Sequence, residues 1–267
     1  MRKAAAFLLR GWLTEISYRT AFVLDLGSMV ILVATMYFLA RAIGTDPHNP
    51  YLRAYGGDYL GFAVVGIVFQ SLVTTSLAAF SRTVRDEQVM GTLEFLFLSD
   101  TPLWRVLIYA AIWDFVWILL ATTITTGVAI FLFGVRLHAN LTAAGVVLAL
   151  TVLALSGVGL ASAGVILVTK RGDPVTWFVG IASGFLGGVL FPIEVLPAPL
   201  HRLALLLPTT HALAALRRAL IMGESTSTLA PSLGLLALFC ALTIPIGTGV
   251  FYWGFRAARR AGSLSHY

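Results

Sequence analysis

Residues 82–105, RTVRDEQVMGTLEFLFLSDTPLWR, form a charged stretch between two strongly apolar segments of the chain. The stretch carries seven charged side chains, whereas the apolar segments, residues 59–80 and 106–133, contain only Asp114 between them. Charged side chains are costly in hydrocarbon, so the stretch is expected outside the membrane and the flanking segments within it. The sequence therefore predicts a charged loop that joins two membrane-spanning helices.

A short, separate helix at about residues 93–98 is expected within this loop. Gly91 is suited to end the preceding helix, because glycine adopts the left-handed conformation without steric cost. Thr92 is suited to cap the next helix by accepting a backbone N–H bond, and Glu94 is favourable near the positive end of that helix. A short capped helix between two spans is suited to docking against a partner protein.

The composition is that of a polytopic membrane protein. Of the 267 residues, 58% are hydrophobic and only 11% are charged, which a soluble domain of this size could not carry on its surface. Crossing a bilayer takes about 20 apolar residues in a helix, and six segments qualify. They are residues 22–42, 58–80, 104–133, 141–169, 175–193 and 232–255. We therefore predict an all-α polytopic membrane protein with six transmembrane helices in a single domain, residues 1–267.

The basic residues set the expected orientation. Twelve of the eighteen Lys and Arg residues fall in the N-terminal arm, the 82–105 loop, the turn at Lys170 and Arg171, and the C-terminal tail. Cytoplasmic loops of membrane proteins carry an excess of Lys and Arg. Both termini and the 82–105 loop are therefore predicted to be cytoplasmic, in a multi-pass protein of the plasma (inner) membrane.

Two further segments are expected at the membrane without crossing it. Residues 1–20 place Leu8 and Trp12 on one helical face and Arg10 on the other, as in an amphipathic helix that lies in the membrane interface. Residues 194–230 are apolar but are divided by prolines into pieces that are too short to span. We expect these pieces to be short re-entrant helices on the outer side, before the last span.

Several chemical functions are excluded by the motifs that the sequence lacks. The phosphate-binding pattern G-x-x-x-x-G-K-[S/T] is absent, so the chain is not expected to bind ATP itself. Ser183 and His211 do not fit an intramembrane serine protease, because Ser183 lacks the leading glycine of a G-x-S-G loop. Cys240 is the single cysteine and has no partner for a disulfide or a cysteine-based metal site. No catalytic residue, metal or cofactor is expected in this chain.

The order of these features resembles the membrane permeases of type-2 ATP-binding-cassette exporters. The resemblance rests on the six spans, the N-terminal amphipathic helix, and the sequences E-x-x-x-G-T-L-E at 87–94, FPIEVLP at 191–197 and PTTHALAALRRAL at 208–220. It covers nearly the whole chain. In such exporters two permease subunits work with two separate ATPase subunits, which bind ATP and Mg. The loop after the second span docks into a cleft on the ATPase.

The resemblance also implies roles for individual residues. The loop after the second span would couple to the ATPase, and the next inner turn would form a second, smaller contact. The segments after the fifth span would close an outer gate, and the fifth span would meet the second permease subunit. The residues are Arg85, Glu87, Gly91, Thr92, Leu93 and Glu94 for coupling; Lys170, Arg171 and Asp173 for the second contact; Phe191, Pro192, Glu194, Pro197, Pro208 and His211 for the gate; and Gly180, Gly184 and Gly188 for the dimer interface.

Other residues leave two interpretations open. Gln70, Thr74, Asp114 and Thr122 are candidates for a polar pathway through the membrane, but hydrogen bonding between helices explains them equally well. The glycines spaced four residues apart from Gly180 to Gly188 serve packing either between subunits or within the chain. Arg217 and Arg218 belong either to a solvated helix face or to a contact with lipid phosphate.

The sequence as a whole predicts the membrane-spanning permease subunit of an ATP-driven exporter. The expected cargo is an amphipathic or lipid-linked compound (drug, glycolipid or glycan), moved outward between two permease subunits that form a homodimer or heterodimer. Separate nucleotide-binding ATPase subunits, a second permease subunit and membrane lipid are the expected partners, without nucleic acid. The alternative is a secondary transporter or a membrane scaffold with no ATPase partner.

Overall fold

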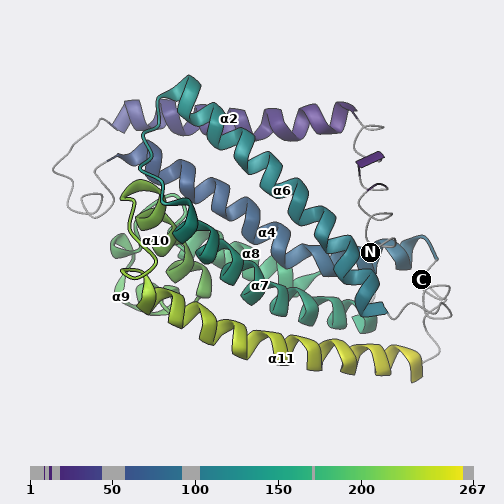
Figure 1. The fold of residues 1–267 in the computed structure, drawn as a ribbon. Helices are drawn as coiled ribbons and strands as arrows, with labels where there is room; N and C mark the ends of the chain where they lie inside the picture. Colours follow the sequence, from purple (N-terminus) through teal and green to yellow (C-terminus); the bar gives the residue numbers. More distant parts are fainter. Residues whose placement is uncertain are drawn as a thin grey trace.

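The computed structural model describes residue 9 and residues 12–13, 19–43, 58–91, 103–169 and 172–260. Every regular element in this part of the chain is a helix, which confirms the all-α prediction. The long helices run side by side (Figure 1): α4, α7 and α11 run in one direction, and α2 and α6 run in the opposite direction. Their bounds are α2 Arg19–Ile43, α4 Tyr59–Val89, α6 Leu103–Phe133, α7 Leu141–Thr169, α8 Pro174–Leu186, η1 Ile193–Val195, α9 Ala198–Ala204, α10 Pro208–Ile221 and α11 Ala230–Arg260.

The prediction of six full spans is not confirmed. Within the described residues four helices are long and apolar enough to cross a membrane, namely α4, α6, α7 and α11, and they make the chain a multi-pass membrane protein. In α2 the apolar stretch is the shorter Gly27–Ala42. Helix α8 has 13 residues, which is roughly 20 Å of helix against a hydrocarbon core of about 30 Å. The predicted span 175–193 is wrong in length, because the helix ends before Gly187.

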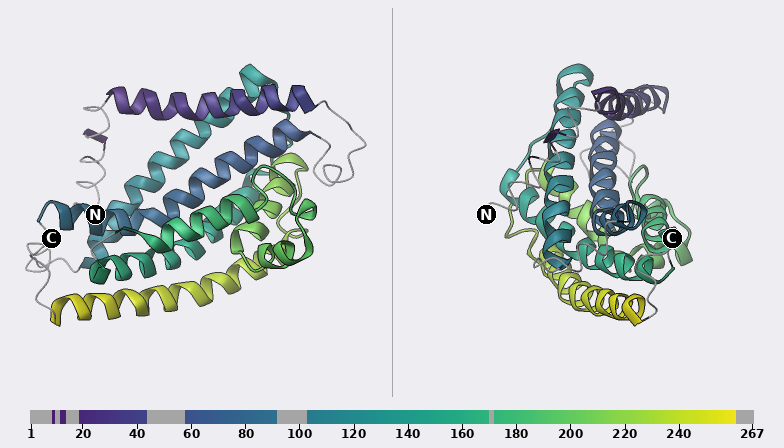
Figure 2. Two further views of the ribbon diagram at one scale, coloured as in Figure 1. Left: turned by 180° about the vertical axis from the view of Figure 1, so that it is seen from behind. Right: turned by 90° about the vertical axis from the view of Figure 1, so that its right-hand side faces the viewer.

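Helix α4 lies at the centre of the bundle (Figure 2) and is the most buried of the four long helices. Asp58 caps its start, since the carboxylate Oδ1 accepts a hydrogen bond from the Leu60 N–H at 3.0 Å. The helix then continues through its apolar part to Val89 without a break. Arg82, Arg85 and Glu87, which belong to the predicted 82–105 loop, are therefore on the last turns of α4, the helix that Gly91 was expected to end.

The most extensive contact between helices joins α7 and α11, and two pairs of glycines permit it. A Cβ atom on Gly247 would lie 1.8 Å from the Gly157 carbonyl oxygen, and one on Gly254 would lie 2.0 Å from the Gly164 carbonyl oxygen. Small residues let membrane helices approach closely, and packing then stabilises the pair. Sequence reasoning missed both pairs, because the glycines belong to segments far apart in the chain.

The glycine ridge predicted for the fifth span is not a continuous helical ridge. Gly188 lies beyond the end of α8, in a turn where its φ is +78°. Gly184 faces α4, and a Cβ atom there would lie 3.3 Å from the Nε2 atom of Gln70. Gly180 has no atom within 4 Å of its Cβ position. Of the three glycines, Gly184 therefore packs within the chain and Gly180 is the one left open.

The segment between α8 and α11 folds into short helices at one end of the bundle (Figure 2), which we term the α10 end. Pro197 precedes α9, and Pro208 is the first residue of α10. None of these helices is long enough to cross a membrane, as predicted for residues 194–230. Helix α10 packs against α7, α4 and α11 and buries Leu213 and Leu216 in the main core. We term the opposite end, where α4 stops, the Gly91 end.

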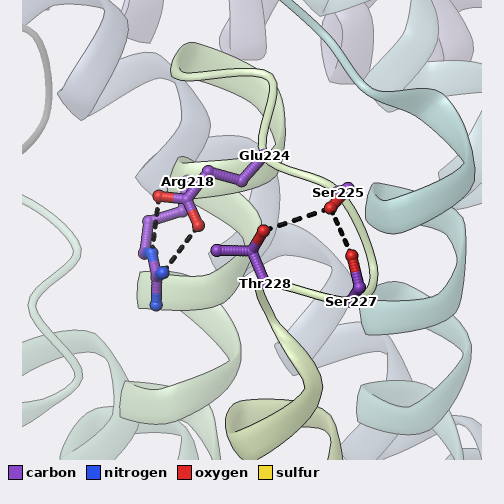
Figure 3. A network of polar contacts seen from close by, with 5 residues as sticks. All are labelled: Arg218, Glu224, Ser225, Ser227 and Thr228. Carbon is purple, nitrogen blue, oxygen red and sulfur yellow. Dashed lines mark hydrogen bonds and ion pairs between the residues drawn. The ribbon is translucent and has the colours of Figure 1, made fainter.

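A turn closed by polar contacts leads from α10 to α11 (Figure 3). Arg218 donates two hydrogen bonds to the Glu224 carboxylate, at 2.9 Å and 2.6 Å. The Ser225 hydroxyl oxygen lies 2.7 Å from that of Ser227 and 3.1 Å from that of Thr228. A bidentate pair between Arg and a carboxylate adds geometric specificity as well as energy. Arg218 therefore orders the turn, and its side chain stays 36% exposed, which agrees with the solvated helix face considered from the sequence.

Candidate functional site

Helix α4 ends at the glycine that the sequence indicated. The Met90 N–H donates to the Asp86 carbonyl at 2.9 Å, and the Gly91 N–H donates to the Gln88 carbonyl at 3.1 Å. Gly91 has a φ of +67°, a conformation in which glycine avoids the strain of other residues. The predicted helix stop is thus confirmed. The coupling residues Thr92, Leu93 and Glu94 and the predicted helix at 93–98 are outside the described residues.

Asp173 fixes the start of α8 beside α7 and α4. Its carboxylate accepts the Thr176 N–H at 3.0 Å and a hydrogen bond from the Ser162 hydroxyl of α7. The Thr176 hydroxyl in turn donates to the Leu77 carbonyl of α4 at 3.3 Å. Burial alone would raise the pKa of Asp173, but hydrogen bonds from Ser162, Ser81 and Thr176 outweigh it and lower the pKa. The carboxylate therefore stays ionised and holds three helices together.

A cavity of ≈ 680 Å³ lies between the last turns of α4 and the first turn of α8. We term it the Arg82 cavity. Arg82 and Arg85 come from α4, Asp173 precedes α8, and Trp177 belongs to α8. The remaining lining residues are Ala78, Ser81, Ile166, Gly172, Pro174 and Thr176. The structure thus brings the predicted coupling residue Arg85 and the predicted second-contact residue Asp173 to one cavity; Lys170 and Arg171 are outside the described residues.

A polar stripe on α4 leads from the Arg82 cavity toward the middle of the bundle. Gln70 and Thr74 precede Ala78 and Arg82 at four-residue spacing, which places them along one side of the helix. The Gln70 Nε2 atom donates to the Gly180 carbonyl of α8 at 3.1 Å. Its Oε1 atom is buried and has no hydrogen-bond partner within the described residues. Of the predicted pathway residues, Gln70 therefore contacts α8, whereas the exposed Thr74 hydroxyl donates to carbonyls of its own helix.

The other two predicted pathway residues lie on a different helix. Asp114 and Thr122 belong to α6, which packs mainly on α4 and α2. The Thr122 hydroxyl is buried and donates to the Ile118 carbonyl of its own helix at 2.7 Å. For Thr122 this contact fits the structural interpretation. The four candidates thus lie on two helices that pack on each other, α4 and α6, and their role as a pathway stays a prediction.

The structure contradicts both interpretations of Arg217 that the sequence left open, because this residue is buried. Its side chain is only 3% exposed, so it forms neither a solvated helix face nor a contact with lipid phosphate at the surface. The Nη1 atom donates to the Gly188 carbonyl at 2.7 Å, and the Nη2 atom donates to the Val189 carbonyl at 2.8 Å. The Nε and Nη2 atoms donate to the Phe62 carbonyl of α4 at 3.2 Å and 3.0 Å. One guanidinium thus binds α10, the turn after α8 and α4 together.

The close approach of these segments depends on Gly66 of α4. A Cβ atom at this position would lie 2.1 Å from the Val189 carbonyl oxygen and 2.8 Å from the Nη2 atom of Arg217. The sequence held a signal for the burial, because Arg217 follows Leu213 by four residues and so shares its apolar face. A charged residue on an apolar helix face is a candidate for a buried contact.

The predicted gate residues gather at the α10 end, but they make different kinds of contact. Phe191 packs the edge of its ring on Phe185, with the centroids 5.8 Å apart. The His211 Nε2 atom lies 2.8 Å from the Leu205 carbonyl oxygen. Of the others, Pro192 is buried before η1, Glu194 is exposed, Pro197 precedes α9 and Pro208 begins α10.

The contacts of Ser183 and His211 do not form a nucleophile and base pair. Ser183 is buried, and its hydroxyl accepts a hydrogen bond from the Thr209 hydroxyl at 3.3 Å. His211 lies against the Leu205 carbonyl instead. Proteolytic chemistry needs the base within hydrogen-bond reach of the nucleophile. The structure therefore supports a packing role for Ser183.

A comparison with known protein families gives a match over most of the chain. A protein-family model described as "ABC-2 family transporter protein" matches residues 22–248. The matched range includes both the residues of the Arg82 cavity and the contacts of Arg217. A search among curated proteins gave no match.

Proposed function

Since this chain belongs to the ABC-2 family of transporter proteins, we propose that it is the permease subunit of an ATP-driven exporter. The observation that carries this proposal is the meeting of residues 82–91 and 172–177 around the Arg82 cavity. These two segments are far apart in the sequence, and together they bring Arg82, Arg85 and Asp173 to one surface at the Gly91 end. A separate ATPase subunit, which binds the ATP and Mg, would dock on this surface.

Helix α4 would carry the effect of ATP binding to the α10 end. Its 31 residues correspond to roughly 46 Å of continuous helix. The end of α4 near the Arg82 cavity bears Arg85 and Glu87. The Phe62 carbonyl near its other end accepts hydrogen bonds from Arg217 of α10. A displacement of α4 would therefore move the segment that contains the predicted gate residues.

The proposal requires the Gly91 end to face the cytoplasm and the α10 end to face outward. Asp86 and Ser227 are exposed at these two ends. A membrane-impermeant maleimide should label Ser227→Cys in intact cells and Asp86→Cys only after the membrane is permeabilised. The native Cys240 is buried, so the unmodified chain serves as the control. Labelling of Asp86→Cys in intact cells would reverse the orientation and with it the direction of export.

Two permease subunits would meet along α8. Its exposed apolar side chains include Trp177, Phe178 and Ile181, and Gly180 is open beside them. Gly180→Leu should therefore weaken the permease dimer without disturbing the fold of one subunit. Gly184→Leu would not separate the two effects, because its side chain would press on Gln70 within the same chain. An unchanged dimer in Gly180→Leu, shown by crosslinking in membranes, would place the interface elsewhere.

Purification from native membranes tests the proposal against a secondary transporter or scaffold. In mild detergent the tagged chain should carry a nucleotide-binding subunit in equal amount, together with ATP hydrolysis. Amphipathic drugs, glycolipids and lipid-linked glycans should be compared for stimulation of that hydrolysis, because they are the proposed cargo classes. A chain that purifies without any ATPase and moves its cargo without ATP would support the alternative.

A further inference from the structure

We propose that the Arg82 cavity binds the anionic head, a phosphate or carboxylate, of an amphipathic compound that reaches it from the adjacent membrane leaflet. This inference rests on the proposed function, because it names the chemical class of the exported cargo. It assigns Arg82 and Arg85 to the head of the compound and the apolar wall of the cavity to its tail.

The two arginines provide the positive charge. Arg82 and Arg85 are three residues apart on α4, so their side chains leave the same side of the helix. Both are exposed, and neither forms a hydrogen bond or ion pair with the rest of the chain that the structure describes. A guanidinium binds phosphate or carboxylate through two parallel hydrogen bonds, which gives Arg an advantage over Lys at such sites.

The one carboxylate in the cavity lining, that of Asp173, offsets only one of the two positive charges. Asp173 accepts hydrogen bonds from the Thr176 N–H and the Ser162 hydroxyl, so its oxygen is directed at the start of α8 and at α7. Two arginines and one carboxylate leave a net formal charge of +1 among the lining residues. The acidic residues Asp86 and Glu87 follow on α4 but do not line the cavity.

The rest of the lining suits an apolar tail. Ala78, Ile166, Pro174 and Trp177 line the same cavity, whose volume of ≈ 680 Å³ is within the range of about 300–1,000 Å³ typical of small-molecule sites. Trp177 and Phe178 are each 68% exposed. Aromatic side chains of this kind favour the boundary between lipid and water. The apolar surface continues along α8 to Phe185, which offers a tail a route away from the charged head.

The ATPase subunit is proposed to dock on the surface around the cavity, so the competing occupant is an acidic segment of that subunit that reaches into the cavity itself. A hydrophilic protein loop would pair with Arg82 and Arg85, but it would leave the apolar wall of Ala78, Ile166 and Pro174 without a suitable contact. An amphipathic anion satisfies both parts of the cavity at once, so we favour it. Replacing Arg82 and Arg85 separates the two occupants. If a loop of the ATPase fills the cavity, the replacement should release the ATPase subunit. If an amphipathic anion fills it, the replacement should abolish small-molecule binding.

The test is equilibrium binding to the full chain in phosphatidylcholine nanodiscs, measured by calorimetry without ATP. The probes are dihexanoyl phosphatidic acid, dihexanoyl phosphatidylcholine and inorganic phosphate. The variants are Arg82→Gln with Arg85→Gln, Arg82→Lys with Arg85→Lys, and a control of equal charge, Arg202→Gln with Arg259→Gln. Arg202 and Arg259 are exposed and do not line the cavity. Each variant should elute from a size-exclusion column at the same volume as the native chain, which confirms that it is folded.

Phosphatidic acid should bind the native chain at least about tenfold more tightly than phosphatidylcholine or inorganic phosphate do. The Gln pair should reduce this affinity about tenfold or more, the Lys pair should retain part of it, and the control should leave it unchanged within about twofold. Equal binding of both lipids, or no effect of the Gln pair, would overturn the inference. Equally tight binding of inorganic phosphate would show a site for free anions instead.

The two proposals fail in different ways. If the Gln pair loses the ATPase subunit from purified membranes but binds phosphatidic acid normally, the cavity docks the ATPase and the cargo inference is wrong. If phosphatidic acid binds through Arg82 and Arg85 in a chain that has no ATPase partner, the cavity inference stands and the proposed function fails.

Discussion

Arg217 lies over the ring of Phe62, with the guanidinium carbon 3.3 Å from the ring centroid, while its nitrogens donate to the Phe62 carbonyl. The two residues are 155 positions apart in the sequence. The pair therefore joins the proline-broken segment at the α10 end to the central helix of the bundle. A cation above an aromatic face is stabilising, more so where water is excluded. We expect this contact to hold the α10 end in place.

Replacing Arg217 should destabilise the protein more than replacing any exposed arginine. Arg217→Met keeps the apolar stem but leaves the Gly188 and Val189 carbonyls without their donor, at a cost of about 2–4 kcal/mol in unfolding free energy. Arg217→Lys should have a smaller effect, because a single ammonium reaches fewer of the carbonyls. The measurement is thermal unfolding of the purified chain in mild detergent.

Arg202→Met is the control, since Arg202 is exposed at the same end of the bundle. Surface substitutions of this kind usually change the unfolding free energy by less than about 0.5 kcal/mol. Equal unfolding temperatures for Arg217→Met and Arg202→Met would show that the buried guanidinium does not stabilise the fold.

The glycine contacts between α7 and α11 predict that alanine at two nearby positions, 247 and 249, will have very different effects on the free energy of unfolding. Gly247→Ala would place a methyl group against the Gly157 backbone, so the helices must separate, at a cost of about 1–3 kcal/mol. Gly249→Ala meets no atom within 4 Å and should be neutral or stabilising by up to about 1 kcal/mol, because alanine favours a helix. Unfolding temperatures that fall equally in both variants would contradict the close contact.

Asp173 should contribute to stability in a way that depends on pH. Its pKa is lowered in the folded chain, so its contribution is present above the ordinary value of 3.8 and is lost as the pH falls through the folded value. Asp173→Ala should therefore cost about 1 kcal/mol at pH 7, and the difference from the native chain should shrink below pH 3.8. Asp173→Asn should retain part of the capping, since its amide oxygen still accepts a hydrogen bond. If the loss of stability in Asp173→Ala stays constant with pH, the cap of α8 is not an ionised carboxylate.

Gly91 should be needed for coupling to the ATPase. Proline fixes φ near −65° and has no N–H, so Gly91→Pro would change the direction of the chain after α4 and remove the bond to Gln88. Gly134→Pro is a matched control after α6, because Gly134 has a φ of +70° and donates to the Ile130 carbonyl at 3.2 Å. Gly91→Pro should insert into membranes but lose its ATPase partner on purification. Loss of the partner in both variants would point to general misfolding.

The local features of the fold could be predicted from the sequence, because they depend on neighbouring residues. The stop at Gly91 and the short helices after Pro197 and Pro208 follow from backbone restrictions that glycine and proline impose wherever they occur. The length of α8 could not be predicted in this way. Its apolar run continues past Leu186, so hydropathy predicts a longer helix. The chain instead turns at Gly187, and the turn brings the Gly188 and Val189 carbonyls to Arg217.

The candidate site was predicted in its parts but not as a whole. Arg85 and Asp173 were each assigned to a contact with the ATPase, yet only the packing of α8 on α4 shows that they line one cavity. The burial of Arg217 depends on carbonyls that come from α4 and from the turn after α8. Such contacts between distant segments leave no pattern in a single sequence.

Photo-crosslinking at the Gly91 end tests the central claim most directly. A benzoyl-phenylalanine in place of Asp86 puts a reactive group on the exposed last turn of α4, and the same group in place of Arg202 puts it at the opposite end. After irradiation of living cells, the adduct at position 86 should contain an ATP-binding subunit, and the adduct at position 202 should not. Crosslinking of no ATPase at position 86 in a folded, membrane-inserted chain would contradict the account.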